Sequence, residues 1–432
     1  MIWYFLFHVY IIDINDKKEV TCLKGNAYFF DRKAEKDTVT GMEVIRLTDN
    51  KGNYDRPYFT TPQFTADNKF TIFVSDFTHT SVIKNPFAPA IGKIGFGELF
   101  LLELETGKVL QVTQGEAIKM GHGAHAMLAP DGKSAYYYSN EQLKTVDLET
   151  LESRELMWIP FTYHFHSLSM TNDGRYLAFS LVEEVQLLTE RFANPLAESA
   201  PGARERFFKK PGSLVIRYDM HLGVGEVVYG GHYRITHTSL KPDDGDYLLY
   251  CHDGPWHLVQ RMWVARVSSD EVTPLILQQH NLEGVVHEFF TPSGRVGAQY
   301  SYRYKPDMPF FMFADIYVDI NGNNQERYYY PFQRPGHVGI NPAETMGVGD
   351  CAMLSANMKD SQRYLSLIEY NHADHRAEMA LLCAHDTSGK KSAHVHPSFT
   401  ADGNHIVFSS DKEGALNIYM VEANIAKAVR KV

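Results

Sequence analysis

The sequence predicts an all-β fold, a seven-bladed β-propeller, from a repeated turn, the strands that flank it and a histidine at one register. Turns of the type Pro-Asp-Gly recur at intervals of roughly 40 to 70 residues, a period typical of propellers and arrays. They lie near Asp67, Asp131, Asp173, Asp244, Ser293, Ala343 and Asp402, which makes seven units. We therefore expect one domain, residues 1–432, although the length alone would suggest two or three.

Each unit continues with short strands. After most turns comes an apolar strand, as at residues 70–74, 247–250 and 405–408. A third strand then leads into a hairpin rich in Asp, Asn and Gly, as at residues 147–150 and 319–322. Three or four short strands per unit match a propeller blade. Residues 40–47 form an outer strand without an inner strand of their own, and we expect them to close the ring against the last blade.

Three segments depart from the blade pattern. Residues 78–97 and 184–210 are insertions that carry several prolines, and long insertions of this kind are usually functional loops or disordered. We expect these insertions to be either lids over the mouth of the channel or loops without a function. The apolar start, residues 1–12, lacks a basic region and a small-residue cleavage site and is too short to span a bilayer. A buried strand is favoured there over an export signal.

Composition excludes several partners. The formal net charge of −10 argues against a nucleic-acid groove, which needs clustered Lys and Arg. A small anionic ligand stays possible, because a buried metal or a few Arg can invert the local charge. The four cysteines show no CxxC spacing, which indicates reduced thiols in a reducing compartment. We expect a cytoplasmic protein with no membrane partner.

A histidine stands five residues before the turn in most units. The positions are His125, His237, His287, His337 and His396, and His166 joins them if residues 171–174 form a four-residue turn. Twenty histidines among 432 residues would place fewer than one at seven such positions by chance. The recurrence therefore predicts a site, or a lining, at one level of a central channel.

His394 and His396 are two residues apart, so on an inner strand they face the same way. His337 occupies the matching position one blade earlier. Three imidazoles from two neighbouring strands can converge on one divalent cation and leave positions for water and substrate. The alternative for any one of them is a hydrogen-bonded packing residue.

Three further residues are candidates for catalysis or binding. His287 would face the metal, and its ordinary pKa suits a general base at neutral pH; a fourth ligand or a structural role is the alternative. Arg261 is either a fork for a carboxylate or a solvated strand end. His252 either contacts substrate or caps a turn. The chain has no GxSxG, HExxH or Walker motif, which argues against the serine-hydrolase, zinc-protease and nucleotide-binding classes.

Several motifs together resemble, in order, those of oligogalacturonate lyases, which are seven-bladed propeller enzymes of pectin breakdown. They are Thr236-His237, residues 241–244, residues 251–255, Arg261-Met262-Trp263, His287-Glu288-Phe289, Gly336-His337 and residues 394–399. The similarity runs from about residue 40 to residue 419 and is most specific from His237 onward. The family binds a divalent metal, usually manganese, through three His and one Gln, and uses a His base with an Arg neighbour.

The resemblance assigns a role to each matching residue. It implies His337, His394 and His396 as metal ligands, His287 as the base and Arg261 as its neighbour. The family's Gln is replaced here by Lys391, which donates hydrogen bonds when protonated and cannot bind a metal. We expect Lys391, His237 and His252 to contact substrate instead.

The implied reaction is β-elimination from a 4-linked uronide, so the expected partner is a small acidic oligosaccharide. A metal and an Arg would neutralise the carboxylate beside C5, His287 would remove the C5 proton, and the glycosidic oxygen at C4 would leave. Two alternatives stay open. One is a non-catalytic propeller that serves as a binding or scaffold protein, and the other is a metal-dependent hydrolase.

Overall fold

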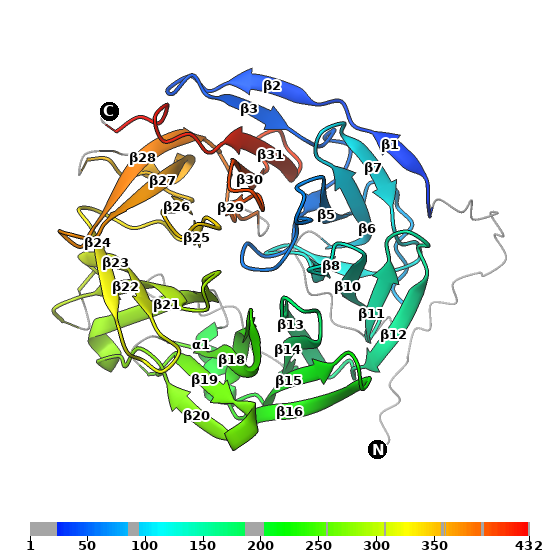
Figure 1. The fold of residues 1–432 in the computed structure, drawn as a ribbon, viewed down its shortest axis with the longest axis horizontal. Coiled ribbons are helices and arrows are strands. Elements are labelled where there is room, and N and C mark those ends of the chain that lie inside the picture. The colour runs from blue at the N-terminus through cyan, green and yellow to red at the C-terminus, as the bar shows by residue number, and fades with distance from the viewer. Residues whose placement is uncertain are drawn as a thin grey trace, which may run out of the picture.

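The computed structural model describes residues 24–84, 95–185, 203–255, 258–305, 308–355, 358, 360–389 and 393–430. These residues form strands with short connections and one α-helix, α1 (Ala203–Lys209). Figure 1 shows the strands arranged in a ring around a common centre, which confirms the all-β propeller architecture. The apolar start of the chain and the middle parts of both insertions lie outside the described residues.

Antiparallel pairing orders the strands into four-stranded groups along the chain. The first groups are β4 (Tyr54–Asp55), β5 (Phe70–Ser75), β6 (Gly95–Glu103) and β7 (Lys108–Gln111), with β1 (Ala27–Phe29) outside β7; then β9 (Ala126–Leu128), β10 (Ser134–Ser139), β11 (Gln142–Asp147) and β12 (Ser153–Trp158); then β13 (Tyr163–Met170), β14 (Tyr176–Glu183), β15 (Ser213–Asp219) and β16 (Val224–Gly231).

The remaining groups follow the same order. They are β17 (Arg234–Lys241), β18 (Asp244–Asp253), β19 (Met262–Arg266) and β20 (Glu271–Pro274); β21 (Glu283–Phe290), β22 (Val296–Tyr302), β23 (Met312–Val318) and β24 (Glu326–Tyr330); β25 (Val338–Ile340), β26 (Met346–Gly349), β27 (Tyr364–Asn371) and β28 (Arg376–Ala384); and β29 (Ser398–Phe399), β30 (His405–Ser410) and β31 (Asn417–Glu422). Short 3-10 turns lie at Val267–Ser269, His280–Leu282 and Ser361–Arg363.

Hydrogen bonding joins some neighbouring groups into larger sheets. Strand β8 (Ile118–Met120) pairs with both β6 and β10, and Tyr329 of β24 pairs with Arg376 of β28. The described strands therefore form five continuous sheets rather than one per blade. The number of seven blades remains an interpretation of the strand order.

The two ends of the described chain meet in one blade. Strand β3 (Glu43–Arg46) pairs with β31 at Val44 with Val421, and β2 (Lys33–Lys36) lies outside β3. Figure 1 shows this pair of early strands beside the last strand of the chain. The prediction that residues 40–47 close the ring is confirmed.

Inner strands carry a bulge at the histidine register. The ladder shifts between Thr236 and Ser239 on β17 and between Val286 and Phe289 on β21. His237 (φ 54°), His287 (φ 55°) and His396 (φ 42°) all adopt positive φ, which non-glycine residues rarely do. A bulge re-aims a side chain, so the repeat turns these imidazoles toward the centre.

One register assignment from the sequence was wrong. The turns begin at Thr291 and Thr400, where the backbone oxygen accepts from Gly294 and Gly403, and the equivalent turn begins at Thr171 with Gly174 as donor. Counting back four residues gives His287 and His396, but Ser167 in the third unit. Ser167 also has the positive φ of this register (60°), so it occupies the position that we predicted for His166.

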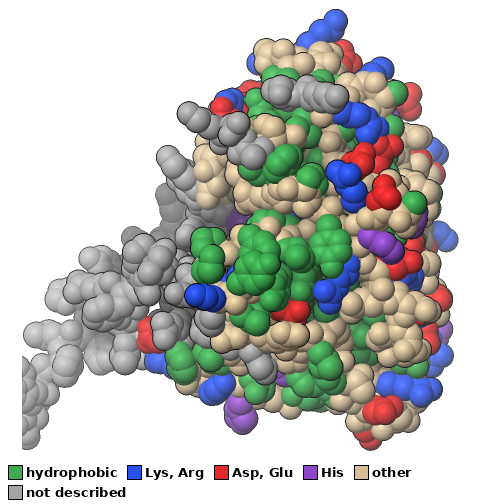
Figure 2. All heavy atoms as spheres, turned by 90° about the vertical axis from the view of Figure 1, so that its left-hand side faces the viewer, with side chains coloured by type: hydrophobic (Ala, Val, Ile, Leu, Met, Phe, Trp, Pro, Cys, Tyr) green, Lys and Arg blue, Asp and Glu red, His purple; other side chains and the backbone are tan. Residues whose placement is uncertain are grey.

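Apolar side chains fill the spaces within and between blades. One core cluster joins Val348 and Leu367 of one blade to Phe408 and Val421 of the next. Some large apolar side chains are exposed, among them Tyr304, Phe311 and Met312, at 69%, 44% and 38% of their surface. Figure 2 shows hydrophobic side chains gathered on the side of the molecule that is on the left in Figure 1. In the described part of the chain we find no helix with the length and apolar character needed to span a bilayer.

Candidate active site

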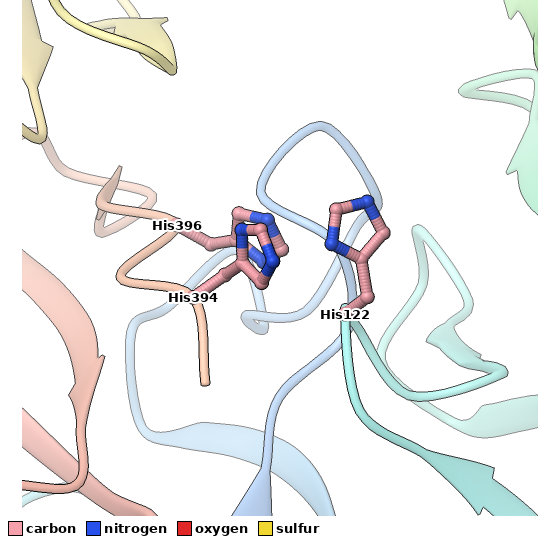
Figure 3. Close-up of side chains that lie close together, drawn as sticks. All are labelled: His122, His394 and His396. Carbon is pink, nitrogen blue, oxygen red and sulfur yellow. The ribbon is translucent and has the colours of Figure 1, made fainter. Parts of the chain in front are cut away.

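Three imidazoles converge at the centre of the ring. His394 and His396 lie just before β29, and His122 faces them from the connection between β8 and β9 (Figure 3). Their ligand-capable nitrogens all lie within 4.8 Å of one another. The ring centroids of His122 and His394 are 4.2 Å apart, and those of His394 and His396 are 5.1 Å apart.

His337 lies beside this group. Its ring centroid is 4.6 Å from that of His396 and 5.7 Å from that of His394. The structure therefore brings the three predicted ligands together. It also adds His122, which the register argument missed because this residue is outside the repeated turn. The signal in the sequence was its flanking glycines, since Gly121 (φ 93°), His122 (φ 64°) and Gly123 (φ 96°) form a left-handed stretch that glycine favours.

A carboxylate orients His337. The Nδ1 atom of His337 lies 2.6 Å from Oδ2 of Asp350, and the backbone N–H groups of Gly336 and His337 donate to Oδ1 at 2.7 and 3.0 Å. Burial alone would raise the pKa of Asp350, but His337 and these hydrogen bonds hold it at about 2. An ionised Asp350 keeps the proton on Nδ1 and leaves Nε2 of His337 available as a ligand.

Two consecutive residues of the first blade hold the loops of the other histidines. Asp55 Oδ2 accepts from the backbone N–H of Gly121 at 2.7 Å, next to His122. Arg56 donates from Nη2 to the carbonyl oxygen of His396 and to Oγ of Ser398, both at 2.9 Å. Arg56 is 2% exposed, so it acts as an internal clamp rather than a surface charge.

The four clustered imidazoles suit a divalent metal. Burial lowers the pKa of His394 to about 4, and burial with the neighbouring histidines lowers the pKa values of His122 and His396 well below 6.5. Neutral imidazole is the form that binds a metal. Nε2 of His396 is buried and has no hydrogen-bond partner among the described residues. A metal ion would supply the missing partner, so the donor set fits it.

His287 lies on the other side of His337, with ring centroids 4.4 Å apart. Its Nδ1 is 3.0 Å from Oε1 of Gln299, which assigns the proton to Nδ1 because an amide oxygen only accepts. Burial, and then the neighbouring His337 and Arg334, lower the pKa of His287 well below 6.5. The side chain is therefore neutral, with Nε2 free to accept a proton.

Arg261 is held by two carboxylates. Its Nε donates to Oε2 of Glu288 at 3.0 Å, and its Nη1 donates to Oδ1 of Asp253 at 3.1 Å. Burial alone would raise the pKa of Glu288, but Arg261 and His237 hold it below its ordinary value. Nδ1 of His237 lies 3.7 Å from Oε1 of Glu288. Arg261 is thus neither a solvated strand end nor a free fork, but part of a buried charge network.

The predicted substrate contacts His237 and His252 lie in different surroundings. His237 and Glu288 line a central cavity of about 210 Å³, together with Tyr58 and His122. His252 is outside that lining and stacks on Tyr233, with ring centroids 4.2 Å apart. The expectation that it contacts substrate or caps a turn stays a prediction. Lys391 lies outside the described residues.

Tyr58 stands among the histidines. Its ring centroid is 4.7 Å from that of His396, 5.4 Å from that of His237 and 6.0 Å from that of His122. No sequence pattern singles out Tyr58, because it lies in the connection between β4 and β5 and belongs to no motif.

A second cavity of about 290 Å³ opens beside the central one. The described ends of both insertions line it, with Ile83 and Phe96 from the first and Glu184 and Arg206 from the second. The expectation was that the insertions are either lids over the channel mouth or loops without a function, and it stays a prediction.

Comparison with known proteins decides the family. The model of the oligogalacturonate lyase family matches residues 22–427, nearly the whole chain. The chain belongs to the oligogalacturonate lyase family. It is 26% identical over 415 residues to the oligogalacturonate lyase of Dickeya dadantii, covering 92% of this chain and 98% of that protein. The oligogalacturonide lyase of Pectobacterium atrosepticum is also 26% identical, over 416 residues, with the same coverage.

Solved structures agree on the fold. An oligogalacturonate lyase from Vibrio parahaemolyticus superposes with a TM-score of 0.75 at 24% identity, covering 94% of this chain and all of that one. An oligogalacturonate lyase solved in complex with manganese superposes with a TM-score of 0.76 at 22% identity, with the same coverage of both chains. Family membership confirms the predicted carbon-oxygen lyase and disfavours a non-catalytic scaffold.

Proposed function

We propose that this lyase cleaves short 4-linked oligogalacturonides by β-elimination, with manganese held by His337, His394 and His396 and by His122 as a fourth ligand. The observation that carries the proposal is the cluster of neutral imidazoles around a buried, unpartnered Nε2 of His396. The related lyase structure that contains manganese supports the choice of metal. His122 would occupy the coordination position that Lys391 cannot fill.

The metal, when bound, neutralises the substrate carboxylate and so makes the neighbouring C5 proton more acidic. His287 accepts that proton at Nε2, because its Nδ1 is already committed to Gln299. Gln299 thereby fixes the tautomer and the direction of the ring. The buried charge of Arg261 favours negative charge in the substrate, and its two carboxylates hold the guanidinium in place. The electron pair of the broken C5–H bond forms the C4–C5 double bond as the C4 oxygen leaves.

The test is direct incubation of the purified protein with digalacturonate and manganese. The expected products are galacturonate and an unsaturated or keto uronate that reacts in a keto-acid assay, with no water added in the mass spectrum. Two molecules of galacturonate would instead indicate a hydrolase. No turnover on any of a panel of uronides would contradict the proposal.

We also propose a cytoplasmic location. It is supported by three buried free thiols, Cys251, Cys351 and Cys383. Recovery of the protein with periplasmic or extracellular material after cell fractionation would contradict it.

A further inference from the structure

The central cavity and the second cavity share one wall, which we call the neck. The shared residues are Lys119, His125, Phe165, His166 and Arg234. Lys119 lies on β8, three residues before the proposed metal ligand His122. A ligand that extends beyond the metal cluster into the second cavity must therefore pass Lys119 and Arg234.

The neck is short of negative charge. Among the described residues, no carboxylate lies within ion-pair distance of Lys119. Arg234 pairs with Asp253, which also accepts from Arg261, and Glu288 is the second carboxylate of Arg261. Burial, and then the charge of Arg234, lower the pKa of Lys119 to about 8, while the carboxylate of Asp55 acts in the opposite direction. Burial and Arg206 lower the pKa of Arg234 to about 10. Lys119, a buried cation without an ion-pair partner among the described residues, lies beside the second cation Arg234 on a cavity wall, and this arrangement favours an anion there.

The second cavity suits a sugar ring beyond that anion. Its lining includes Tyr138, Phe161, Tyr163 and Phe165, and the rings of Tyr138 and Phe165 stack with centroids 4.7 Å apart. Ligand pockets commonly combine such apolar walls with a few polar groups that orient the ligand. The carboxylates of Glu183 and Glu184 are in the lining too, but they are not among the residues shared at the neck.

We propose that Lys119 and Arg234 form a second carboxylate-binding subsite, for the uronate residue that adjoins the one at the histidine cluster. This inference rests on the proposed function, since it assumes that the histidine cluster receives a uronate. It makes the neck a recognition site for substrates with two consecutive acidic residues.

Lys119→Gln tests the subsite, because Gln keeps much of the length and removes the charge. We expect binding of digalacturonate, measured calorimetrically with manganese present, to weaken roughly 10- to 100-fold, as for the loss of a charge-assisted contact. Binding of the monomer galacturonate should change less than twofold. Lys119→Arg should restore most of the affinity for digalacturonate. Lys133→Gln, which removes an exposed lysine at the turn between β9 and β10, should leave both affinities unchanged.

The outcomes separate this inference from the proposed function. Wild-type affinity for digalacturonate in Lys119→Gln, or equal weakening for dimer and monomer, would overturn the subsite even if the protein is an active lyase. Selective weakening for the dimer would support the subsite even if no turnover occurs. An unchanged thermal unfolding temperature of Lys119→Gln would show that the fold is intact. If that temperature falls, Lys119→Met is tested in place of Lys119→Gln.

Discussion

Arg56 donates a hydrogen bond from Nη2 to the carbonyl oxygen of His396 at 2.9 Å, across 340 positions of the chain. It ties the first blade to the loop of a predicted metal ligand. We expect Arg56→Met to weaken manganese binding at least 10-fold in a chelator competition, because the loop loses its clamp. Ser398→Ala removes only the second acceptor of Nη2 and should have a much smaller effect. Equal losses in both variants would mean that general packing, not the clamp, matters.

Asp350→Asn removes the charge that orients His337 while keeping the side-chain volume. We expect manganese affinity or kcat to fall roughly 10- to 100-fold, as for other carboxylate partners of metal-bound histidines. Asp315→Asn is the matched control, since Asp315 is also buried but accepts from Tyr330 and Tyr370. A loss in the control as large as that in Asp350→Asn would argue against a specific role for Asp350.

His287→Gln removes the proposed base. We expect kcat on digalacturonate to fall roughly 10²- to 10⁴-fold, the usual contribution of a general base, with little change in KM or manganese affinity. His252→Gln changes a histidine that stacks on Tyr233 and should keep most of the activity. A His287→Gln enzyme with near wild-type kcat would exclude His287 as the base.

Removal of the metal should abolish turnover, and added manganese should restore it.

His122→Ala tests the proposed fourth ligand. We expect the dissociation constant for manganese, measured by competition with a chelator, to rise at least 10-fold above that of the wild type. His221→Ala, at an exposed position, is the control. Wild-type manganese affinity in His122→Ala would leave His337, His394 and His396 as the ligand set.

The buried carboxyl group of Glu98, which lies away from the histidine cluster, should make the unfolding free energy depend on pH. Burial raises its pKa to about 7, although Thr113 and two backbone N–H groups bind the carboxylate. The pKa of Glu98 is higher in the folded state than in the unfolded state, so the protonated side chain stabilises the fold. This contribution to the unfolding free energy is fully present below about pH 4.5 and is lost as the pH rises through about 7.

The variant Glu98→Gln removes this titration. We expect wild type to lose on the order of 2 kcal/mol of unfolding free energy relative to Glu98→Gln between pH 5 and pH 8, measured by denaturant titration. Parallel pH profiles of wild type and variant would contradict the assignment.

Much of the site was predictable because the backbone repeats. A fixed number of residues separates each turn from the histidine before it, and this spacing predicted the positions of His237, His287, His337 and His396. The closed ring then places these histidines at the same level of the central channel. The count went wrong for His166 because the first residue of that turn was taken one position too early.

The rest depends on contacts between distant parts of the chain. His122 belongs to no repeated turn, and only the closed ring places it 4.2 Å from His394. Arg261 could not be distinguished from a solvated strand end, because its partners Asp253 and Glu288 come from two other strands. Pairings of this kind are set by packing and leave no local pattern.

The closing blade also bears on when activity can arise. His394 and His396 precede β29, and the blade that contains them is completed by β3 from the other end of the chain. A nascent polypeptide on the ribosome already contains β3 but lacks the late histidines until synthesis is almost finished. The proposed cation-binding centre is therefore completed only at the final step of assembly, so products truncated at the C-terminus should be free of metal as well as inactive.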